Sequence, residues 1–239
     1  MGATHQALLM AGSAYPGLTA DPYFTNVGLL LRSNGPNGGT TFTDESSFSR
    51  TVTRTGTPTI STAESKYGGG SAHISSAGCL TVSHDTSIDM VTGDFTLEFW
   101  LHLESTTTYY ILMLKANGVG FYPWLFWVTP DYKVQFRGWD NTGPTLAYNL
   151  TTTTVLSAGN WYHIAGTRSG NDFRLFLDGV LEDSSTFSGT LFSSTANVAI
   201  GGYDNGTNST AGYMDDIRVT KGVARYTAAF TPPLEAAPF

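Results

Sequence analysis

The chain has 239 residues, of which 41% are hydrophobic and 13% are charged, and its formal net charge is −7. This much apolar material with so little charge excludes a disordered chain. Only 12 residues are Lys or Arg, which leaves no basic surface for a phosphate backbone, so we expect no nucleic-acid partner. A single cysteine, Cys79, excludes an internal disulfide.

The beginning of the chain differs in pattern from the rest. Residues 1–26 lack strand-like alternation and include Pro16 and Pro22, so we expect an irregular N-terminal arm, followed by one domain at residues 27–239. Its apolar stretch at residues 7–14 is too short to span a membrane and lacks the basic flank of a signal peptide. We therefore expect no membrane insertion.

Short strand-like runs separated by turn residues fill the remainder. The first are at residues 27–32, 51–54, 72–75 and 79–83. Residues 95–104 alternate most clearly, with apolar side chains at the odd positions and Glu98, Trp100, His102 and Glu104 on the other face. This pattern predicts a strand with one face in a core.

The middle of the chain adds three further strands. Residues 109–115 and 121–129 are apolar on both faces, which is typical of central strands, or of strands that lie against a ligand or partner. Residues 132–139 alternate again, and their second face carries Lys133, Gln135, Arg137 and Trp139. The long polar and aromatic side chains of that face suit binding.

The last strand-like runs are at residues 161–168, 173–177, 197–201 and 212–220, with an Asp-Gly hairpin signal at Asp178 and Gly179. No stretch of ten or more residues has a convincing helical period. The sequence therefore predicts an all-β protein, built as a two-sheet antiparallel β-sandwich.

Seven motifs carry a resemblance to a known family. They are TTFTDES at residues 40–46, ISTAESKYGGGS at 60–71, GDFTLEFW at 93–100, NWYHIA at 160–165, LFLDG at 175–179, GYMDDIRVTKGVARY at 212–226 and FTPP at 230–233. Together they resemble the laminin G-like jelly-roll domains of the concanavalin A-like lectin/glucanase superfamily. The resemblance covers residues 27–233 in the order of the family and implies the same sandwich fold.

The sequence of residues 216–233 is similar to that of domains found in virion proteins of tailed bacteriophages, such as tail fibres and capsid decoration proteins. This resemblance implies a structural virion subunit, made in the host cytoplasm, which forms a homo-oligomer and joins other capsid or tail proteins through its N-terminal arm.

Hydrolases of the same superfamily pair two carboxylates on one strand, about 5 Å apart in retaining enzymes. Here Glu98 and Glu104 share a face but are roughly 20 Å apart along an extended strand. No other hydrolase motif is present, so we expect a protein that is not an enzyme and has no catalytic residue.

The resemblance also implies one structural calcium ion, which would be the only cofactor. Asp216 matches the late acidic position of the family, with Asn34 and Gly70 as candidate oxygen donors. Relatives usually carry an acid where this chain has Asn34, and the loss of that charge weakens the expected site. Alternatively, Asp215 and Asp216 cap a turn.

Sugars present apolar C–H faces rimmed by hydroxyl groups, so a glycan site needs aromatic side chains beside hydrogen-bonding ones. The candidates are Trp139 with Arg137 and Asp140, and Trp124 with Trp127. Alternatively, these tryptophans lie in the core, or residues 121–128 form a subunit interface. We therefore expect a structural or assembly protein of a virion, with a carbohydrate-binding lectin module as the alternative and a glycoside hydrolase as the weakest reading.

Overall fold

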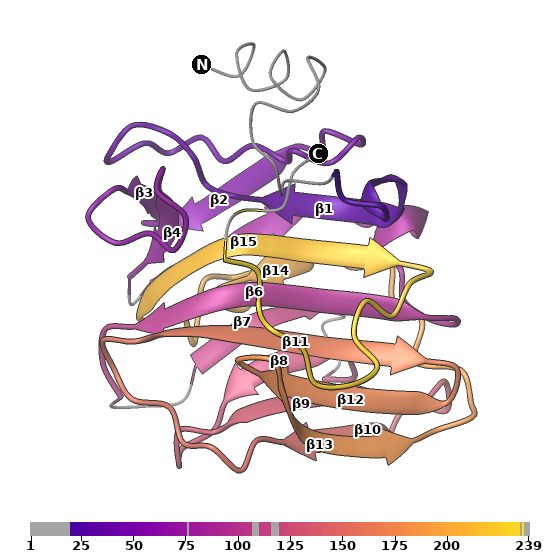
Figure 1. Ribbon diagram of the computed structural model, residues 1–239. Helices are drawn as coiled ribbons and strands as arrows, with labels where there is room; N and C mark the ends of the chain where they lie inside the picture. The colour runs from indigo at the N-terminus through magenta and orange to yellow at the C-terminus, as the bar shows by residue number, and fades with distance from the viewer. Residues whose placement is uncertain (1–19, 76, 107–109, 116–119, 235, 237–239) are drawn as a thin grey trace.

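The computed structural model describes residues 20–75, 77–106, 110–115, 120–234 and 236. These residues form two antiparallel β-sheets packed face to face, with helical structure confined to two short 3₁₀ turns, η1 (Phe24–Asn26) and η2 (Thr86–Ile88). Figure 1 shows the two sheets as layers, one behind the other. The predicted all-β sandwich is confirmed. Among these residues no helix is long and apolar enough to cross a membrane.

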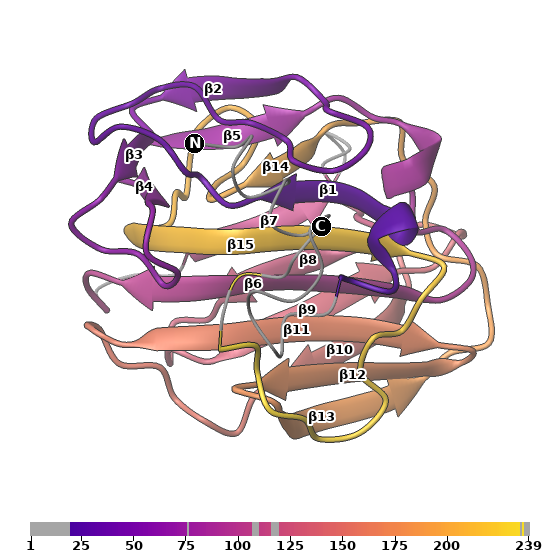
Figure 2. The same ribbon diagram turned by 45° about the horizontal axis from the view of Figure 1, so that its top comes forward.

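One sheet has eight strands, and its order is β13-β12-β11-β6-β15-β4-β3, with β1 also paired to β15. The bounds are β1 Val27–Leu31, β3 Thr59–Ser61, β4 Ser71–Ile74, β6 Phe95–Leu103, β11 Trp161–Ser169, β12 Asp172–Leu177, β13 Val180–Thr186 and β15 Gly212–Lys221. Figure 2 shows β6 and β15 side by side at its centre.

The second sheet has seven strands in the order β10-β9-β8-β7-β14-β5-β2. Its strands are β2 Val52–Gly56, β5 Gly78–Val82, β7 Tyr110–Lys115, β8 Leu125–Val128, β9 Val134–Trp139, β10 Leu146–Thr151 and β14 Val198–Ile200. Most strands of the two sheets match an expected run. β3 and β10 had no predicted counterpart, and β13 was indicated only by the hairpin signal at Asp178 and Gly179. The apolar run at residues 121–129 is a strand only from Leu125 onward.

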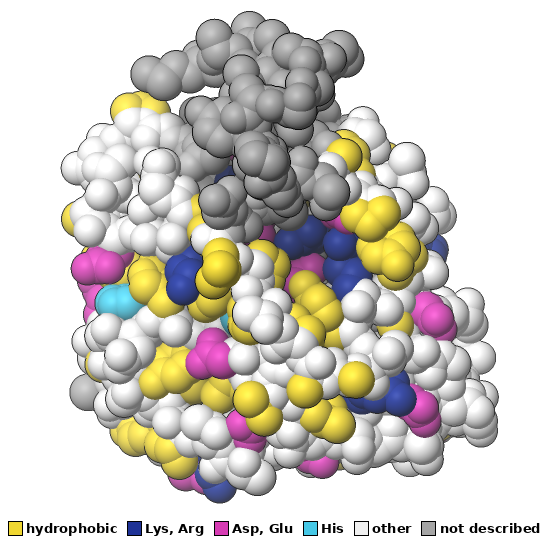
Figure 3. Space-filling model, in the orientation of Figure 1, with side chains coloured by type: hydrophobic (Ala, Val, Ile, Leu, Met, Phe, Trp, Pro, Cys, Tyr) yellow, Lys and Arg dark blue, Asp and Glu magenta, His cyan; other side chains and the backbone are white. Residues whose placement is uncertain are grey.

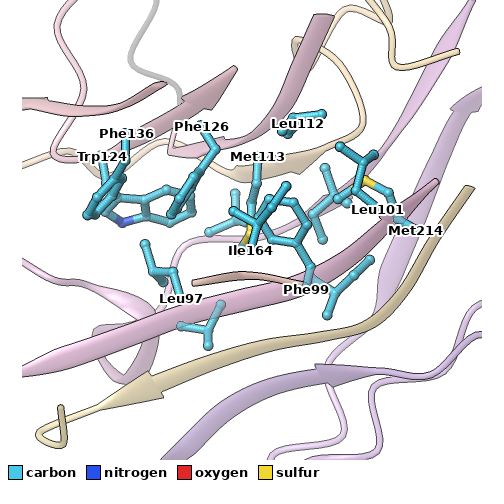
Figure 4. Close-up of a cluster of buried hydrophobic side chains, with 14 of the residues drawn as sticks. Leu97, Phe99, Leu101, Leu112, Met113, Trp124, Phe126, Phe136, Ile164 and Met214 are labelled. Carbon is cyan, nitrogen blue, oxygen red and sulfur yellow. The ribbon is translucent and has the colours of Figure 1, made fainter. Parts of the chain in front are cut away.

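The core lies between the two sheets and is made by the inward side chains of both. Figure 4 shows Leu97, Phe99 and Leu101 of β6 facing Trp124, Phe126 and other side chains from the seven-stranded sheet. Phe126 and Phe136 stack with their ring centroids 4.3 Å apart. Burial of this many large apolar side chains is the dominant force that holds the sheets together.

The segment after β15 crosses the outer face of the eight-stranded sheet (Figure 1). The Thr96 hydroxyl donates to the Val223 carbonyl, and the Phe230 amide donates to the Gly179 carbonyl. The rings of Tyr226 and Phe230 stack with centroids 3.6 Å apart. This segment covers part of the outer face of β6, and Tyr67 and Lys66 cover Trp100 farther along the strand, so that every residue of β6 is buried.

The predicted N-terminal arm, residues 1–26, lies mostly outside the described residues, since the description begins at residue 20. Within its described part, Asp21 forms ion pairs with Arg218 and Arg225 at 3.2 and 2.7 Å. The end of the arm is thus fastened to the eight-stranded sheet.

Candidate functional site

The outer face of the seven-stranded sheet carries the expected polar and aromatic side chains. Alternation along β9 buries Val134 and Phe136 in the core and turns Gln135, Arg137 and Trp139 outward, where each is half-buried. In the neighbouring strand β8, Trp127 pairs with Gln135 and lies on the same outer face. Residues from two adjacent strands therefore meet on one surface.

A small second hydrophobic cluster underlies this surface. It consists of four buried residues from three central strands, and half-buried aromatic rings pack on it: Ile111, Leu114, Leu125 and Ala199 below, with Tyr122, Trp127 and Tyr203 above. We call the surface formed by Tyr122, Trp127, Arg137, Trp139 and Tyr203 the aromatic platform. Its apolar base keeps the rings above it close to one another.

The guanidinium of Arg137 lies between the two indole rings of the aromatic platform. Its central carbon is 4.9 Å from the ring centroid of Trp127 and 5.1 Å from that of Trp139, within the range of a cation–π contact. The Trp127 indole N–H donates to Gln135 Oε1 at 2.6 Å, and Gln135 Nε2 in turn donates to the Thr151 hydroxyl at 3.1 Å. These bonds fix the orientation of the Trp127 ring.

The electrostatics of the aromatic platform are simple. Burial lowers the pKa of Arg137 below its ordinary value, although the tyrosines beside it act in the opposite sense. Burial and the hydrogen bond with Tyr203 raise the pKa of Tyr122 to about 12. A guanidinium remains charged in proteins at every ordinary pH. The platform therefore presents one fixed positive charge among neutral rings.

The structure separates the five predicted glycan-binding residues. Trp127, Arg137 and Trp139 come together on the aromatic platform. Trp124 has no exposed surface and lies in the core beside Phe126, so it cannot contact a ligand at the surface (Figure 4). Its indole points inward because positions 124, 126 and 128 share one phase of the strand alternation.

Asp140 lies directly after Trp139 but serves the turn that follows β9. Its Oδ1 accepts hydrogen bonds from the Thr142 amide at 2.8 Å and the Thr142 hydroxyl at 2.6 Å. This is the arrangement of an Asx turn. The carboxylate of Asp140 thus has a structural role. The backbone of Trp139 is held by other segments, since its amide donates to the Tyr122 carbonyl and its carbonyl accepts from the Phe192 amide.

The predicted calcium ligands lie at one end of the eight-stranded sheet. The Asp216 carboxylate is buried and meets two guanidinium groups, Arg218 Nη2 at 3.3 Å and Arg32 Nε at 3.8 Å. A Cβ built on Gly70 would lie 2.8 Å from the Ser33 carbonyl oxygen, so these two segments approach closely, as expected for a site shared between them.

Two cations already beside Asp216 disfavour a divalent ion at this carboxylate. In the described part of the chain no three His, Cys, Asp or Glu side chains gather in a way that could hold a metal. The calcium ion, with Asn34 and Gly70 as further donors, stays a prediction.

A buried charge network occupies the outer face of the eight-stranded sheet, beneath the C-terminal segment. Glu98 is 1% exposed, and its carboxylate contacts Arg218 Nε at 3.2 Å, His163 Nε2 at 3.3 Å and the Tyr226 hydroxyl at 2.8 Å. Figure 3 shows basic and acidic side chains side by side on this face, next to hydrophobic ones. Glu98 is therefore fully engaged within the protein.

Tyr122, Tyr203 and the partners of Glu98 were not singled out from the sequence. Tyr122 lies in the apolar run at residues 121–129 but precedes β8, and Tyr203 follows β14, so strand alternation assigned neither to a face. The partners of Glu98 are between 65 and 128 positions away in the chain, since His163 and Tyr226 come from β11 and the C-terminal segment. Only the strand register brings them together.

Comparison with known structures supports the fold. The binding domain of Paraclostridial Mosquitocidal Protein 1 is 16% identical, with a TM-score of 0.66, over 85% of this chain and 50% of that chain. The receptor binding domain of botulinum neurotoxin D is 13% identical, with a TM-score of 0.64, over 84% and 50%. This chain thus spans about half the length of the structures it resembles.

A further structure is the botulinum neurotoxin serotype D ligand binding domain in complex with N-acetylneuraminic acid, which is 13% identical with a TM-score of 0.64, over 84% of this chain and 49% of that chain. No curated protein sequence matches the chain. The model of the family described as the concanavalin A-like lectin/glucanases superfamily matches residues 68–225, more than half of the chain. With the sandwich fold and the sequence motifs in agreement, the chain belongs to the concanavalin A-like lectin/glucanase superfamily.

Proposed function

We propose that this protein is a non-enzymatic binding module that holds a glycan on the aromatic platform. The observation that carries the proposal is the pair of half-buried indoles, Trp127 and Trp139, on an open sheet face with hydrogen-bonding groups around them. A pyranose ring has an apolar C–H face that stacks on an aromatic ring, while its hydroxyl groups need polar partners at the rim.

Polar groups surround the aromatic platform on the side of β10. Asn149 pairs with Arg137 across the strands and is exposed, and Thr151 pairs with Gln135. Amide and hydroxyl groups both donate and accept hydrogen bonds, as sugar hydroxyls do. The solved structures with the same fold support the proposal, because they include binding domains in complex with N-acetylneuraminic acid and with SialylT.

Hydrolysis is not part of the proposed function. The only carboxylate of β6 that is buried, Glu98, is surrounded by cations and by Tyr226. A general acid or nucleophile must reach the scissile bond of a substrate. Glu98 lies under the C-terminal segment and cannot do so in this arrangement.

Glycan-array binding, followed by titration calorimetry, tests the proposal. We expect Trp127→Ala and Trp139→Ala each to abolish or strongly weaken binding, because each substitution removes an aromatic ring on which the sugar stacks. Trp161→Ala is the matched control, since Trp161 is also half-buried but contacts His102 on the opposite sheet. Equal binding by all three variants would place the ligand elsewhere, and no binding to any glycan would refute the proposal.

The role in a bacteriophage virion stays a prediction that rests on the resemblance of residues 216–233. We propose it as the setting in which such a module works, with capsid or tail proteins and further copies of the chain as partners. Deletion of residues 1–26 tests the predicted attachment. The truncated protein should fold but fail to join particles, and its incorporation would contradict attachment through the arm.

A further inference from the structure

Arg137 differs from the other arginines in what its guanidinium contacts. Within the described part of the chain, the others all bind protein oxygens: Arg32, Arg50, Arg174, Arg218 and Arg225 form ion pairs with carboxylates, and Arg54 and Arg168 donate to backbone carbonyls. Arg137 contacts two indole rings and has no hydrogen-bond acceptor there, and its Nε is buried without a partner.

An unsatisfied guanidinium is unusual because its five N–H groups normally meet oxygen atoms when water is partly excluded. The rings of Trp127 and Trp139 hold the guanidinium in place but accept no conventional hydrogen bond. Nε is buried, so the two terminal Nη groups, which form no hydrogen bond with the described residues, are the donors available to a ligand that lies on the aromatic platform. The matching acceptor is a carboxylate, whose two oxygens bind the planar fork of arginine in bidentate fashion.

The charge around Arg137 restricts the ligand further. Lys133 directly precedes β9, and its Nζ pairs with Asp131 at 3.4 Å. The pKa of Arg137 is shifted by burial and by Tyr203 and Tyr122, and the carboxylate of Asp204 acts on Tyr122 at the edge of the platform. Arg137 itself forms no ion pair with the described residues, and one such positive charge, on a protein with a net charge of −7, matches one negative charge and disfavours polyanions such as nucleic acids or sulfated chains.

From this geometry we infer that the aromatic platform binds a sugar that carries a single carboxylate, held by the guanidinium of Arg137. The inference rests on the proposed glycan-binding function and adds the class of sugar. The ring of the sugar lies against an indole, and its carboxylate takes the open donors of Arg137. Asn149, opposite Arg137 in the strand pairing, is placed to meet the neighbouring hydroxyl groups.

The test compares each acid with its own neutral ester, on the full chain. N-acetylneuraminic acid and glucuronic acid, both as methyl glycosides, represent the two common kinds of sugar acid, and the methyl ester of each removes only the charge. We expect calorimetry or saturation-transfer NMR to show that at least one acid binds about tenfold more tightly than its ester, which corresponds to about 1.4 kcal/mol.

Two variants connect this preference to Arg137. Arg137→Gln should reduce the affinity for the acid to that for the ester, while the weak binding of the ester persists through the indoles. Arg137→Lys keeps the charge but not the planar fork, so it should keep only part of the preference. Circular dichroism melts of both variants check that the fold is retained.

The outcomes separate the inference from the proposed function. If acid and ester bind equally to the wild type, or if Arg137→Gln keeps the full preference, the inference is wrong while glycan binding stands. If glucose 6-phosphate binds through Arg137 and neither carboxylate does, the inference is also wrong. If no sugar binds at all, the proposed function fails and the inference fails with it.

Discussion

Glu98→Gln tests whether the buried charge network stabilises the fold. The substitution keeps the size of the side chain but leaves Arg218, Arg225 and His163 beside a neutral amide. Removal of one partner from a buried ion pair costs about 3–5 kcal/mol. Because both arginines keep their contacts with Asp21, we expect the lower end of that range, about 3 kcal/mol.

The expected loss is large enough to measure in two ways. For a chain of this length, 1 kcal/mol lowers the Tm by about 2–4 °C, so Glu98→Gln should lower it by about 6–12 °C. Urea denaturation at pH 7 gives the free energy of unfolding directly. The control is Glu104→Gln, on the same strand face but 41% exposed, where we expect a loss below about 1 kcal/mol.

The pH dependence gives a second, independent check. Burial raises the pKa of Glu98, but the opposite effect of Arg218, His163 and Arg225 together is larger. The pKa of Glu98 is therefore held well below its ordinary value of 4.5. A carboxylate of this kind stabilises the native state fully above pH 4.5, and the stabilisation falls as the pH drops below that value. The advantage of the wild type over Glu98→Gln should therefore shrink by about 2 kcal/mol between pH 4.5 and pH 3.

Two results would refute this reasoning. One is a loss at pH 7 no larger than that of Glu104→Gln. The other is a difference between wild type and Glu98→Gln that stays constant down to pH 3, because a purely steric effect of the substitution would not titrate.

Three further substitutions test the core and one buried amine by urea denaturation. Gly166→Ala should cost about 1–3 kcal/mol, because the new Cβ would lie 2.5 Å from Phe126 Cζ and 2.7 Å from Phe136 Cε1; a neutral effect would contradict the packing. Trp124→Phe should lower the stability by only about 1 kcal/mol, since the indole N–H has no acceptor among the described residues. It should leave the glycan affinity unchanged because Trp124 is fully buried, and a weaker affinity would show that Trp124 contributes to the binding site. Burial lowers the pKa of Lys115 from 10.5 to about 8, so above pH 8 the unfolded chain binds more protons than the native protein. The stability of the wild type should therefore rise by about 2 kcal/mol relative to Lys115→Met between pH 8 and 10. Parallel pH profiles of the two proteins would contradict the lowered pKa of Lys115.

Strand alternation made much of the fold predictable. The odd positions of residues 95–104 are apolar, and β6 turns them into the core as expected. The strands β3 and β10 were missed for a physical reason. β3 has only three residues, too few to show a period, and the alternation of β10 is interrupted where its pairing with β9 shifts between Leu146 and Tyr148.

The candidate site was predictable in part. The alternation of β9 placed Arg137 and Trp139 together, and the pairing of β8 with β9 added Trp127. Trp124 was assigned to the same site because the run around it is apolar on both faces, which hides the side of the sheet that each residue faces. Trp124 and Phe126 are two positions apart and face the core together, whereas Trp127 faces outward, and this difference in strand alternation could have separated the two tryptophans. That Arg137 has no ion pair among the described residues could not be predicted, because it depends on where carboxylates from distant parts of the chain lie.

The two outer faces of the sandwich differ in how far the protein satisfies its own charges. On the eight-stranded sheet, the C-terminal segment covers Glu98, and the carboxylates of Asp21 and Asp216 complete the contacts of the arginines. On the seven-stranded sheet, Arg137 is half-buried and has no such partner among the described residues. Folding has already removed part of its water and fixed its position between two rings, so a ligand carboxylate meets a preorganised donor and loses less on binding. This difference favours the aromatic platform as the binding face of the molecule.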